Sequence, residues 1–299
     1  MSNATKPLYL IGGRKSATNP GLFTRGVILL KNETGIHLVT EYRSPPELRV
    51  LGEHTLFKGA TRLGDLLYCC TRKEIVVFQM PGFQQVGYFS HPLFADVHYV
   101  IPLEYGGLLV AVANLEIVLE FDGNGNVVNE HNMSDEALVI DRDLDYRLVR
   151  HDGTPPRAHL NHLVTVNGEV FVTRLIKKDA VSLSDNSRRI DLGDERVHDG
   201  YLFGSELYFT SVNGSIIVVD PVTLTETDRY PLVTGSWCRG LLVDEDSTWV
   251  GFTRRDEADM SIAPTRIARY DLADGSLLEE IDLEPHGMNA IYSIIDATP

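Results

Sequence analysis

Short apolar runs alternate with polar turns along almost the whole chain, and the alternation repeats with a period of about 40 residues. In each copy, inner apolar runs are followed by a more polar final run, and the clearest copy spans 200–203, 207–211, 215–220 and 226–231. Gly- and Asn-rich turns separate the runs, as in Asp122-Gly123-Asn124-Gly125. Repeats made of strands and tight turns are typical of a β-propeller, in which each copy is one four-stranded antiparallel blade.

Five copies are complete enough to be predicted as blades. They extend over 59–90, 98–130, 163–192, 200–231 and 241–283. The inner strands of a blade are covered on both faces by neighbouring blades, so they should be apolar, while the outermost strand can be polar.

The two ends of the chain supply one further blade. Three predicted strands lie near the start, at 8–12, 27–31 and 36–42, and one lies at the end, at 289–296. Pairing them would close the ring and cover an exposed sheet edge. We therefore predict an all-β fold, a single six-bladed β-propeller over 1–299. In this prediction, 47–52 form the outer strand of the blade that is built from the two ends of the chain.

One long stretch, 133–157, exceeds the repeat directly before a histidine-rich segment. It is too polar for a strand, and Ser134-Asp135-Glu136 is typical of a helix start. Long excursions in a compact repeat protein are functional lids or tolerated decoration. We predict a lid over the mouth of the central channel.

Composition narrows the class of protein. With 43% hydrophobic and 23% charged residues the chain resembles a soluble globular protein. A formal net charge of -15 argues against a nucleic acid or an anionic membrane as partner. The first seven residues lack signal-peptide features, and no apolar window approaches the roughly 20 residues of a membrane span. Cys69 and Cys70, adjacent on one predicted strand, would point to opposite faces, which argues against a disulfide framework and favours a cytoplasmic location.

Histidines recur where the chain enters successive blades beside the central channel. His98, His162, His198 and His286 stand at or just before the inner strands of four predicted blades. Imidazole is a common ligand of transition metals, so we predict that these four side chains bind a divalent Fe, Mn, Zn, Cu or Ni ion. The alternative is that each is a hydrogen-bonded structural residue at a strand start.

Other polar residues at the same positions complete the predicted site. Asp96 and Asp199 adjoin histidines and could fix their tautomers or act in catalysis, and Arg239 could anchor an anionic substrate. The predicted substrate-binding residues are Lys58, Asn161, Arg196, Trp237, Cys238, Asn289 and His159. His159 competes with His162 for the inward position. Cys238 beside Arg239 is either a low-pKa thiolate or a buried inert thiol, and Trp237 either stacks on a ligand or packs between blades.

The repeat, with motifs such as Ile217-Val218-Val219-Asp220-Pro221-Val222-Thr223, resembles the superfamily of six-bladed propellers that includes gluconolactonase-like and NHL-repeat proteins. The resemblance covers nearly the whole chain. Gluconolactonase-like enzymes hold a divalent cation at the channel with Glu, Asn and Asp, and the resemblance puts Asn161 and Asp199 in two such places. The surrounding histidines depart from that pattern and look more like those of metal-centred propellers such as carotenoid-cleaving oxygenases, which have seven blades.

These features predict a metal-dependent hydrolase, lyase or oxygenase that acts on a small polar, carboxylate-bearing metabolite at the channel. A non-catalytic propeller that binds a protein or small ligand is the first alternative, and a gluconolactonase-like hydrolase is the second. A metal-free hydrolase that uses Asp/His pairs also remains open. The sequence contains no Gly-rich phosphate loop before a helix, no nucleophile elbow and no helical His-Glu-x-x-His pair.

Overall fold

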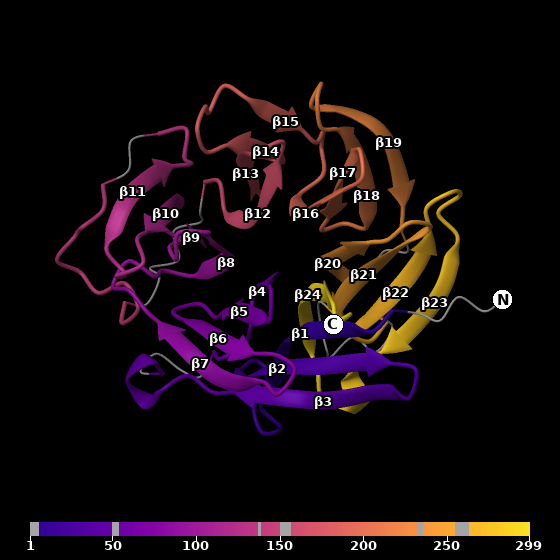
Figure 1. The fold of residues 1–299 in the computed structure, drawn as a ribbon, viewed down its shortest axis with the longest axis horizontal. Helices are drawn as coiled ribbons and strands as arrows, with labels where there is room; N and C mark the ends of the chain where they lie inside the picture. The colour runs from indigo at the N-terminus through magenta and orange to yellow at the C-terminus, as the bar shows by residue number, and fades with distance from the viewer. Residues whose placement is uncertain (1–5, 50–53, 137–138, 150–156, 233–235, 255–262) are drawn as a thin grey trace.

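Six antiparallel sheets surround a central axis in the computed structural model, which describes residues 6–49, 54–136, 139–149, 157–232, 236–254 and 263–299. Over these residues 24 strands form six four-stranded sheets (Figure 1). The predicted all-β, six-bladed propeller is confirmed. Within the same ranges, no helix has the length and apolar character needed to cross a membrane.

Five blades are each built from four consecutive strands, beginning with the one nearest the axis. Blade 1 contains β4 (Gly59–Leu63), β5 (Leu66–Cys70), β6 (Ile75–Gln79) and β7 (Gln84–Phe89). Blade 2 contains β8 (Val97–Pro102), β9 (Leu108–Val112), β10 (Ile117–Phe121) and β11 (Val127–Asn132). Blade 3 contains β12 (Leu160–Val166), β13 (Glu169–Arg174), β14 (Asp179–Ser182) and β15 (Arg189–Asp191). Blade 4 contains β16 (Val197–Phe203), β17 (Glu206–Ser211), β18 (Ser215–Asp220) and β19 (Thr225–Pro231). Blade 5 contains β20 (Ser236–Val243), β21 (Ser247–Arg254), β22 (Arg266–Asp271) and β23 (Leu277–Asp282).

Blade 6 is assembled from both ends of the chain. Its strands, from the axis outward, are β24 (Ala290–Asp296), β1 (Leu8–Lys15), β2 (Phe23–Asn32) and β3 (Gly35–Tyr42). β24 pairs antiparallel with β1, with Leu8 opposite Asp296, so the predicted ring closure is confirmed.

The predicted outer strand at 47–52 is wrong in its described part. β3 already forms the outer edge of blade 6, and Pro46–Leu48 form the short 3₁₀ helix η1. Pro45 and Pro46 lack an N–H for a strand ladder, which favours this turn over an edge strand. Residues 50–52 lie outside the described ranges.

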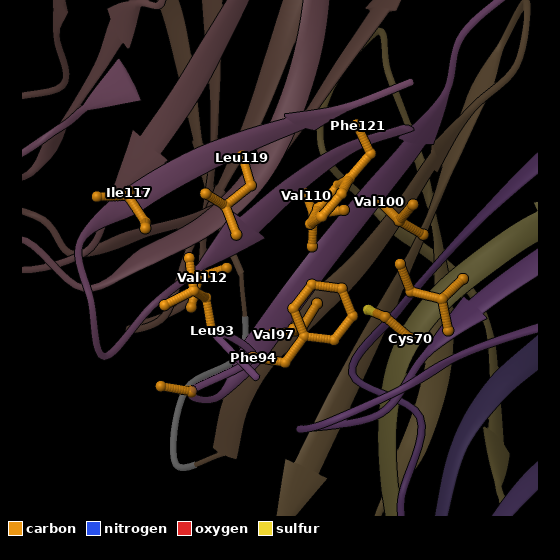
Figure 2. Packing of buried hydrophobic residues seen from close by; sticks show 12 residues of the cluster. Cys70, Leu93, Phe94, Val97, Val100, Val110, Val112, Ile117, Leu119 and Phe121 are labelled. Carbon is orange, nitrogen blue, oxygen red and sulfur yellow. The ribbon is translucent and has the colours of Figure 1, made fainter. Parts of the chain in front are cut away.

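Apolar packing between blades explains the polarity gradient within each copy. In blade 4, β18 is buried at every position except its last residue, whereas β19 is mostly exposed. Between blades 1 and 2, Cys70 packs against side chains that include Phe94, Val97 and Phe121 (Figure 2). Ile75 belongs to the same cluster. Burial of apolar surface of this kind is the main stabilising contribution to such an interface.

Most innermost strands carry a β-bulge near the axis. The ladder register shifts in five blades, at His98, at Asn161-His162, at His198-Asp199, at Arg239-Gly240 and at Tyr292. A bulge adds a residue to one strand and re-aims its side chain. Bulges at these positions explain why copies of the repeat align only to within a residue or two.

The insert at 133–157 forms no helix in its described part, so that prediction is wrong. Met133 is buried against the core between blades 2 and 3, and the side chain of Asn132 accepts a hydrogen bond from the Ser134 N–H, which holds a turn there. Arg142 then forms an ion pair with Glu130 of β11. The lid remains a prediction, because 150–156 lie outside the described residues.

Ring closure provides the first test. A Cβ atom at Gly12 of β1 would lie 1.8 Å from the carbonyl oxygen of Ala290 in β24. We expect Gly12→Ala to lower the free energy of unfolding by about 2 kcal/mol, because paired backbone cannot move aside cheaply. Urea denaturation measures the change. Gly82→Ala is the control, since a Cβ there meets nothing within 4 Å, and equal losses in both variants would contradict this explanation.

Candidate functional site

Six polar or aromatic residues, one from each blade, lie in or directly before the innermost strands and are linked by contacts between blades. These residues, which we call the axial cluster, are Lys58, His98, His159, His198, Arg239 and Tyr292. Contacts across blades join them: Lys58 Nζ lies 2.8 Å from His98 Nε2, and the His98 and His159 rings are 4.9 Å apart. Tyr292 contacts both the His198 ring, at 6.2 Å, and Arg239.

Two residues at this site have an uncommon backbone conformation. Asp96 has φ 65° and His159 has φ 56°, and each directly precedes the innermost strand of its blade. Non-glycine residues rarely adopt this left-handed region, and such strain is concentrated at functional sites. Backbone hydrogen bonds from Ala113 N to Asp96 O and from Leu175 N to His159 O hold these turns in place.

Asp96 is an ionised carboxylate between two cations. Its Oδ1 atom accepts hydrogen bonds from Lys58 Nζ at 2.5 Å and Arg72 Nε at 2.9 Å. Burial would raise the pKa of Asp96, but Lys58, Arg72 and His98 hold that pKa well below its usual range. His98 Nε2 lies 2.8 Å from Lys58 Nζ and 3.3 Å from Asp96 Oδ2, so this ring nitrogen faces both the ammonium group and the carboxylate. His98 Nδ1 is buried and has no hydrogen-bond partner.

His198 and Asp199 form a buried pair. His198 Nδ1 lies 3.1 Å from Asp199 Oδ2, which also accepts hydrogen bonds from Thr210 Oγ1 and the Gly240 N–H. Burial lowers the pKa of His198 despite the opposing effect of Asp199. The imidazole is therefore neutral near pH 7, with its proton on Nδ1. His198 Nε2 is buried without a partner and offers an unused lone pair.

Arg239 is held by aromatic faces. Its Cζ atom lies 4.1 Å from the Trp237 ring centroid and 4.6 Å from that of Tyr292, and its Nε atom is buried without a hydrogen-bond partner. A guanidinium stabilised by ring faces keeps its N–H groups available for an anion. Trp237 is 40% exposed, so the aromatic face of this clamp reaches the surface.

His162 packs away from the predicted ligand position. Its ring centroid lies 3.8 Å from that of Tyr99, and its Nδ1 accepts a hydrogen bond from the Gly200 N–H at 3.4 Å. His159, in contrast, contacts His98 and belongs to the axial cluster. Of these two histidines, His159 is thus the one that contacts the other axial residues.

Four other predicted site residues take structural or surface positions. His286 is exposed in the 3₁₀ helix η2 (Glu284–His286), and Arg196 is exposed before β16. Asn289 accepts a hydrogen bond from the Lys15 N–H through its side-chain oxygen. Cys238 is fully buried in the core of blades 4 and 5, where burial raises its pKa well above the usual value, which favours the buried, inert thiol of the two alternatives.

Asn161 lies within the bulge of β12 and is almost fully buried. Its Nδ2 atom donates to Val197 O in the next blade, while its Oδ1 atom has no partner. The side chain therefore joins blades 3 and 4 and leaves one acceptor unused.

No cluster of four histidines forms among the described residues, and binding of a metal ion stays a prediction. Over the described ranges, no group of three or more His, Cys, Asp or Glu side chains is placed to hold a metal ion. His98 and His198 each use one ring nitrogen within the protein, His162 packs on Tyr99, and His286 is exposed. These four side chains are therefore not gathered at one point in the described structure.

Sequence reasoning missed Arg72, Thr210 and Tyr292. Arg72 lies in the turn between β5 and β6 and reaches Asp96 only through blade packing. Thr210 stands opposite the His198-Asp199 bulge on β17. Tyr292 had a usable signal, because it lies near the start of a predicted innermost strand like the other axial residues.

Comparison with known proteins supports the architecture. No family model and no curated protein matches this chain. Among solved structures, a protein of unknown function from Bacteroides caccae is similar with a TM-score of 0.67 and 12% identity, over 97% of this chain and 98% of that one. A streptogramin B lyase is similar with a TM-score of 0.50 and 18% identity, over 76% and 68% of the two chains.

A further similar structure is a catalytically inactive histidine-to-alanine variant of virginiamycin B lyase from Staphylococcus aureus with quinupristin. Its TM-score is 0.51 and its identity 15%, over 76% of this chain and 69% of that one. At these identities the likenesses establish the fold, and the predicted resemblance to six-bladed propellers is confirmed as a resemblance of architecture.

The pKa values of the buried histidines predict how stability depends on pH. Burial lowers the pKa of His162 to about 4, so between about pH 6.5 and pH 4 the unfolded chain binds a proton that the folded protein does not. Stability should therefore fall with pH below 6.5, by at most about 1.4 kcal/mol per pH unit for this residue.

Urea denaturation at pH 7 and pH 5 tests this effect. We expect His162→Gln to lose about 1 to 2 kcal/mol less than the unmodified protein between these pH values. His286→Gln removes an exposed histidine and should leave the pH-dependent loss unchanged. Equal losses in all three proteins would show that His162 is not responsible.

Proposed function

We propose that this protein is an enzyme that removes a proton from a small carboxylate-bearing metabolite bound at the propeller axis. His198 is the general base, and Arg239 anchors the substrate carboxylate. One observation carries the proposal: His198 Nε2 is buried without a partner while Asp199 holds the opposite nitrogen of the same ring.

The His198–Asp199 pair has the properties of a base. A base must be deprotonated before reaction, and burial keeps the pKa of His198 below its usual value. Asp199 is itself fixed by Thr210 and Gly240, so it orients the imidazole and stabilises the imidazolium that forms after proton transfer. The proton acceptor is thus already oriented before substrate binds.

Charge at the axis favours an anionic substrate. Lys58, Arg72 and Arg239 outnumber Asp96 and Asp199, which leaves one net positive charge at the site of a chain with formal charge -15. A positive site within an acidic protein concentrates anions locally. Arg239 supplies planar N–H donors that match a carboxylate.

The proposed reaction begins with transfer of a proton from a substrate carbon to His198 Nε2. The electron pair of the broken C–H bond moves into the adjacent carboxylate or carbonyl group, and the Arg239 guanidinium stabilises the oxygen that gains charge. The intermediate then either regains a proton or expels a leaving group to form a double bond. Similarity to lyase structures, one of them inactive after histidine replacement, supports elimination over simple exchange.

A binding protein without chemistry is the second candidate. The Arg239 clamp and the exposed face of Trp237 favour it, because both suit ligand recognition and neither requires a base. The two candidates make different predictions for His198, since a binding protein needs Arg239 but no proton acceptor.

Hydrogen–deuterium exchange tests the base. In deuterated buffer, a panel of small carboxylates is incubated with the protein, and NMR follows loss of substrate C–H signals. We expect exchange of at least one compound, slowed about a hundredfold or more by His198→Gln. Asp199→Asn should also slow exchange, while His286→Gln should not. Exchange that persists in both His198→Gln and Asp199→Asn would contradict the role of His198 as the base.

The same protein, purified without an affinity tag, separates the proposal from a metal-dependent reaction. Elemental mass spectrometry measures bound Fe, Mn, Zn, Cu and Ni, and the exchange assay is repeated with a chelator. Under this proposal exchange survives the chelator. Stoichiometric metal together with chelator-sensitive exchange would overturn it in favour of a metal-dependent enzyme.

Carboxylate binding tests the anchor. Calorimetry with any compound that exchanges should give about tenfold weaker binding in Arg239→Lys, because lysine keeps the charge but loses the planar donors and ring stacking. Arg196→Lys is the matched control, since Arg196 is exposed near the same face. Unchanged affinity in Arg239→Lys would remove Arg239 from the site.

A further inference from the structure

A second candidate site lies on the opposite face of the propeller. The axial cluster occupies the first residues of the innermost strands, whereas a cavity of about 480 Å³ is lined by the last residues of β16, β20 and β24 and by the turn between β20 and β21. The volume is in the range of small-molecule sites. Because the two sites use opposite ends of the same strands, the cavity is separate from the site of proposed catalysis.

The cavity combines an apolar wall with excess negative charge. Leu8, Phe203, Leu242 and Trp249 provide the apolar surface. The lining carboxylates are Asp244, Glu245, Asp246, Asp271 and Asp296, and the lining cations are Lys6 and Arg269. An apolar body with positively charged ends is the ligand chemistry that matches this lining.

The ammonium group of Lys6 forms an ion pair with one of these carboxylates, Asp244. Lys6 Nζ lies 2.7 Å from Asp244 Oδ1, and the Lys6 side chain is 50% exposed. This pair holds the pKa of Asp244 below its usual value. An exposed ion pair contributes little to stability, so an external ammonium could replace Lys6 at small cost.

Two cations contact the Trp249 ring: Lys31, which is buried and lies outside the cavity lining, and Arg269, which is part of that lining. Lys31 Nζ lies 4.8 Å from the Trp249 ring centroid, and Arg269 Cζ lies 5.8 Å from it. Trp249 is buried, contributes to the cavity lining and is one of two tryptophans in the chain. Its fluorescence can therefore report on the occupancy of the cavity.

We propose that this cavity binds a small aliphatic diamine or polyamine, with one ammonium group on Asp244 in place of Lys6 and the hydrocarbon chain along Leu242 and Trp249. The remaining carboxylates of the lining receive the further ammonium groups. This site is independent of the proposed proton abstraction.

A fluorescence titration tests the site. In a Trp237→Phe protein, Trp249 is the remaining tryptophan, and 1,5-diaminopentane and spermidine are added to saturation. We expect saturable quenching or enhancement with both amines. Pentane-1,5-diol and glutarate have the same carbon chain without positive charge and should give no saturable change. Absence of saturable change with the amines would overturn the proposal.

Charge variants in the same background test the contact itself. Asp244→Asn should weaken amine binding about tenfold, because it removes the charged partner of the ammonium group. Asp228→Asn, on the exposed strand β19, removes the same charge elsewhere and should leave affinity unchanged. Lys6→Met should strengthen binding, because it removes the internal competitor. Equal effects of the two aspartate changes would indicate general charge attraction and overturn the site.

Two further experiments are controls. The first distinguishes a free amine from a lysine side chain of a peptide, and the second distinguishes amine binding from the proposed proton abstraction. Binding of a lysine-containing peptide but not of the free diamines would contradict the small-molecule assignment. His198→Gln should leave amine binding unchanged whether or not His198 acts as a base, so failure of one proposal does not affect the test of the other.

Discussion

The antiparallel pairing of β24 with β1 closes the ring of six blades. It joins the last strand of the chain to the first and makes blade 6 complete, so that no sheet in the ring is left without a neighbour (Figure 1). Closure fixes the distance between blades and therefore between axial side chains. Tyr292 reaches Arg239 and His198 only because its strand is held in this position.

β-Bulges in the innermost strands determine which polar side chains come together in the axial cluster. A regular innermost strand would alternate its side chains, whereas the extra residues at His98, His198 and Arg239 re-aim polar groups that the ladder does not need. Burial then keeps the imidazoles neutral, and Lys58, Arg72 and Arg239 keep the region positive. The combination of neutral bases and fixed cations suits an anionic substrate that must lose a proton.

The two ends of the innermost strands have opposite electrostatic character. One end carries the axial cluster with its excess of cations, and the other opens on a cavity in which carboxylates outnumber cations. Because each blade contributes to both ends, one repeated scaffold can present two chemically different surfaces without further domains. The overall negative charge of the chain is therefore a poor guide to either site.

The repeat, the six blades and their closure can be predicted from the sequence, because apolar runs and turn residues act locally and recur in every copy. The sequence also indicated Lys58, His98, His198 and Arg239 as axial residues, since they stand at the start of innermost strands. Which polar side chains meet depends instead on bulges and on packing between blades. The bulges moved His162 onto Tyr99, η2 left His286 exposed, and blade packing brought Arg72 to Asp96. A shift of one residue reverses the direction of a strand side chain, and such shifts are set by cross-strand contacts that sequence spacing does not contain.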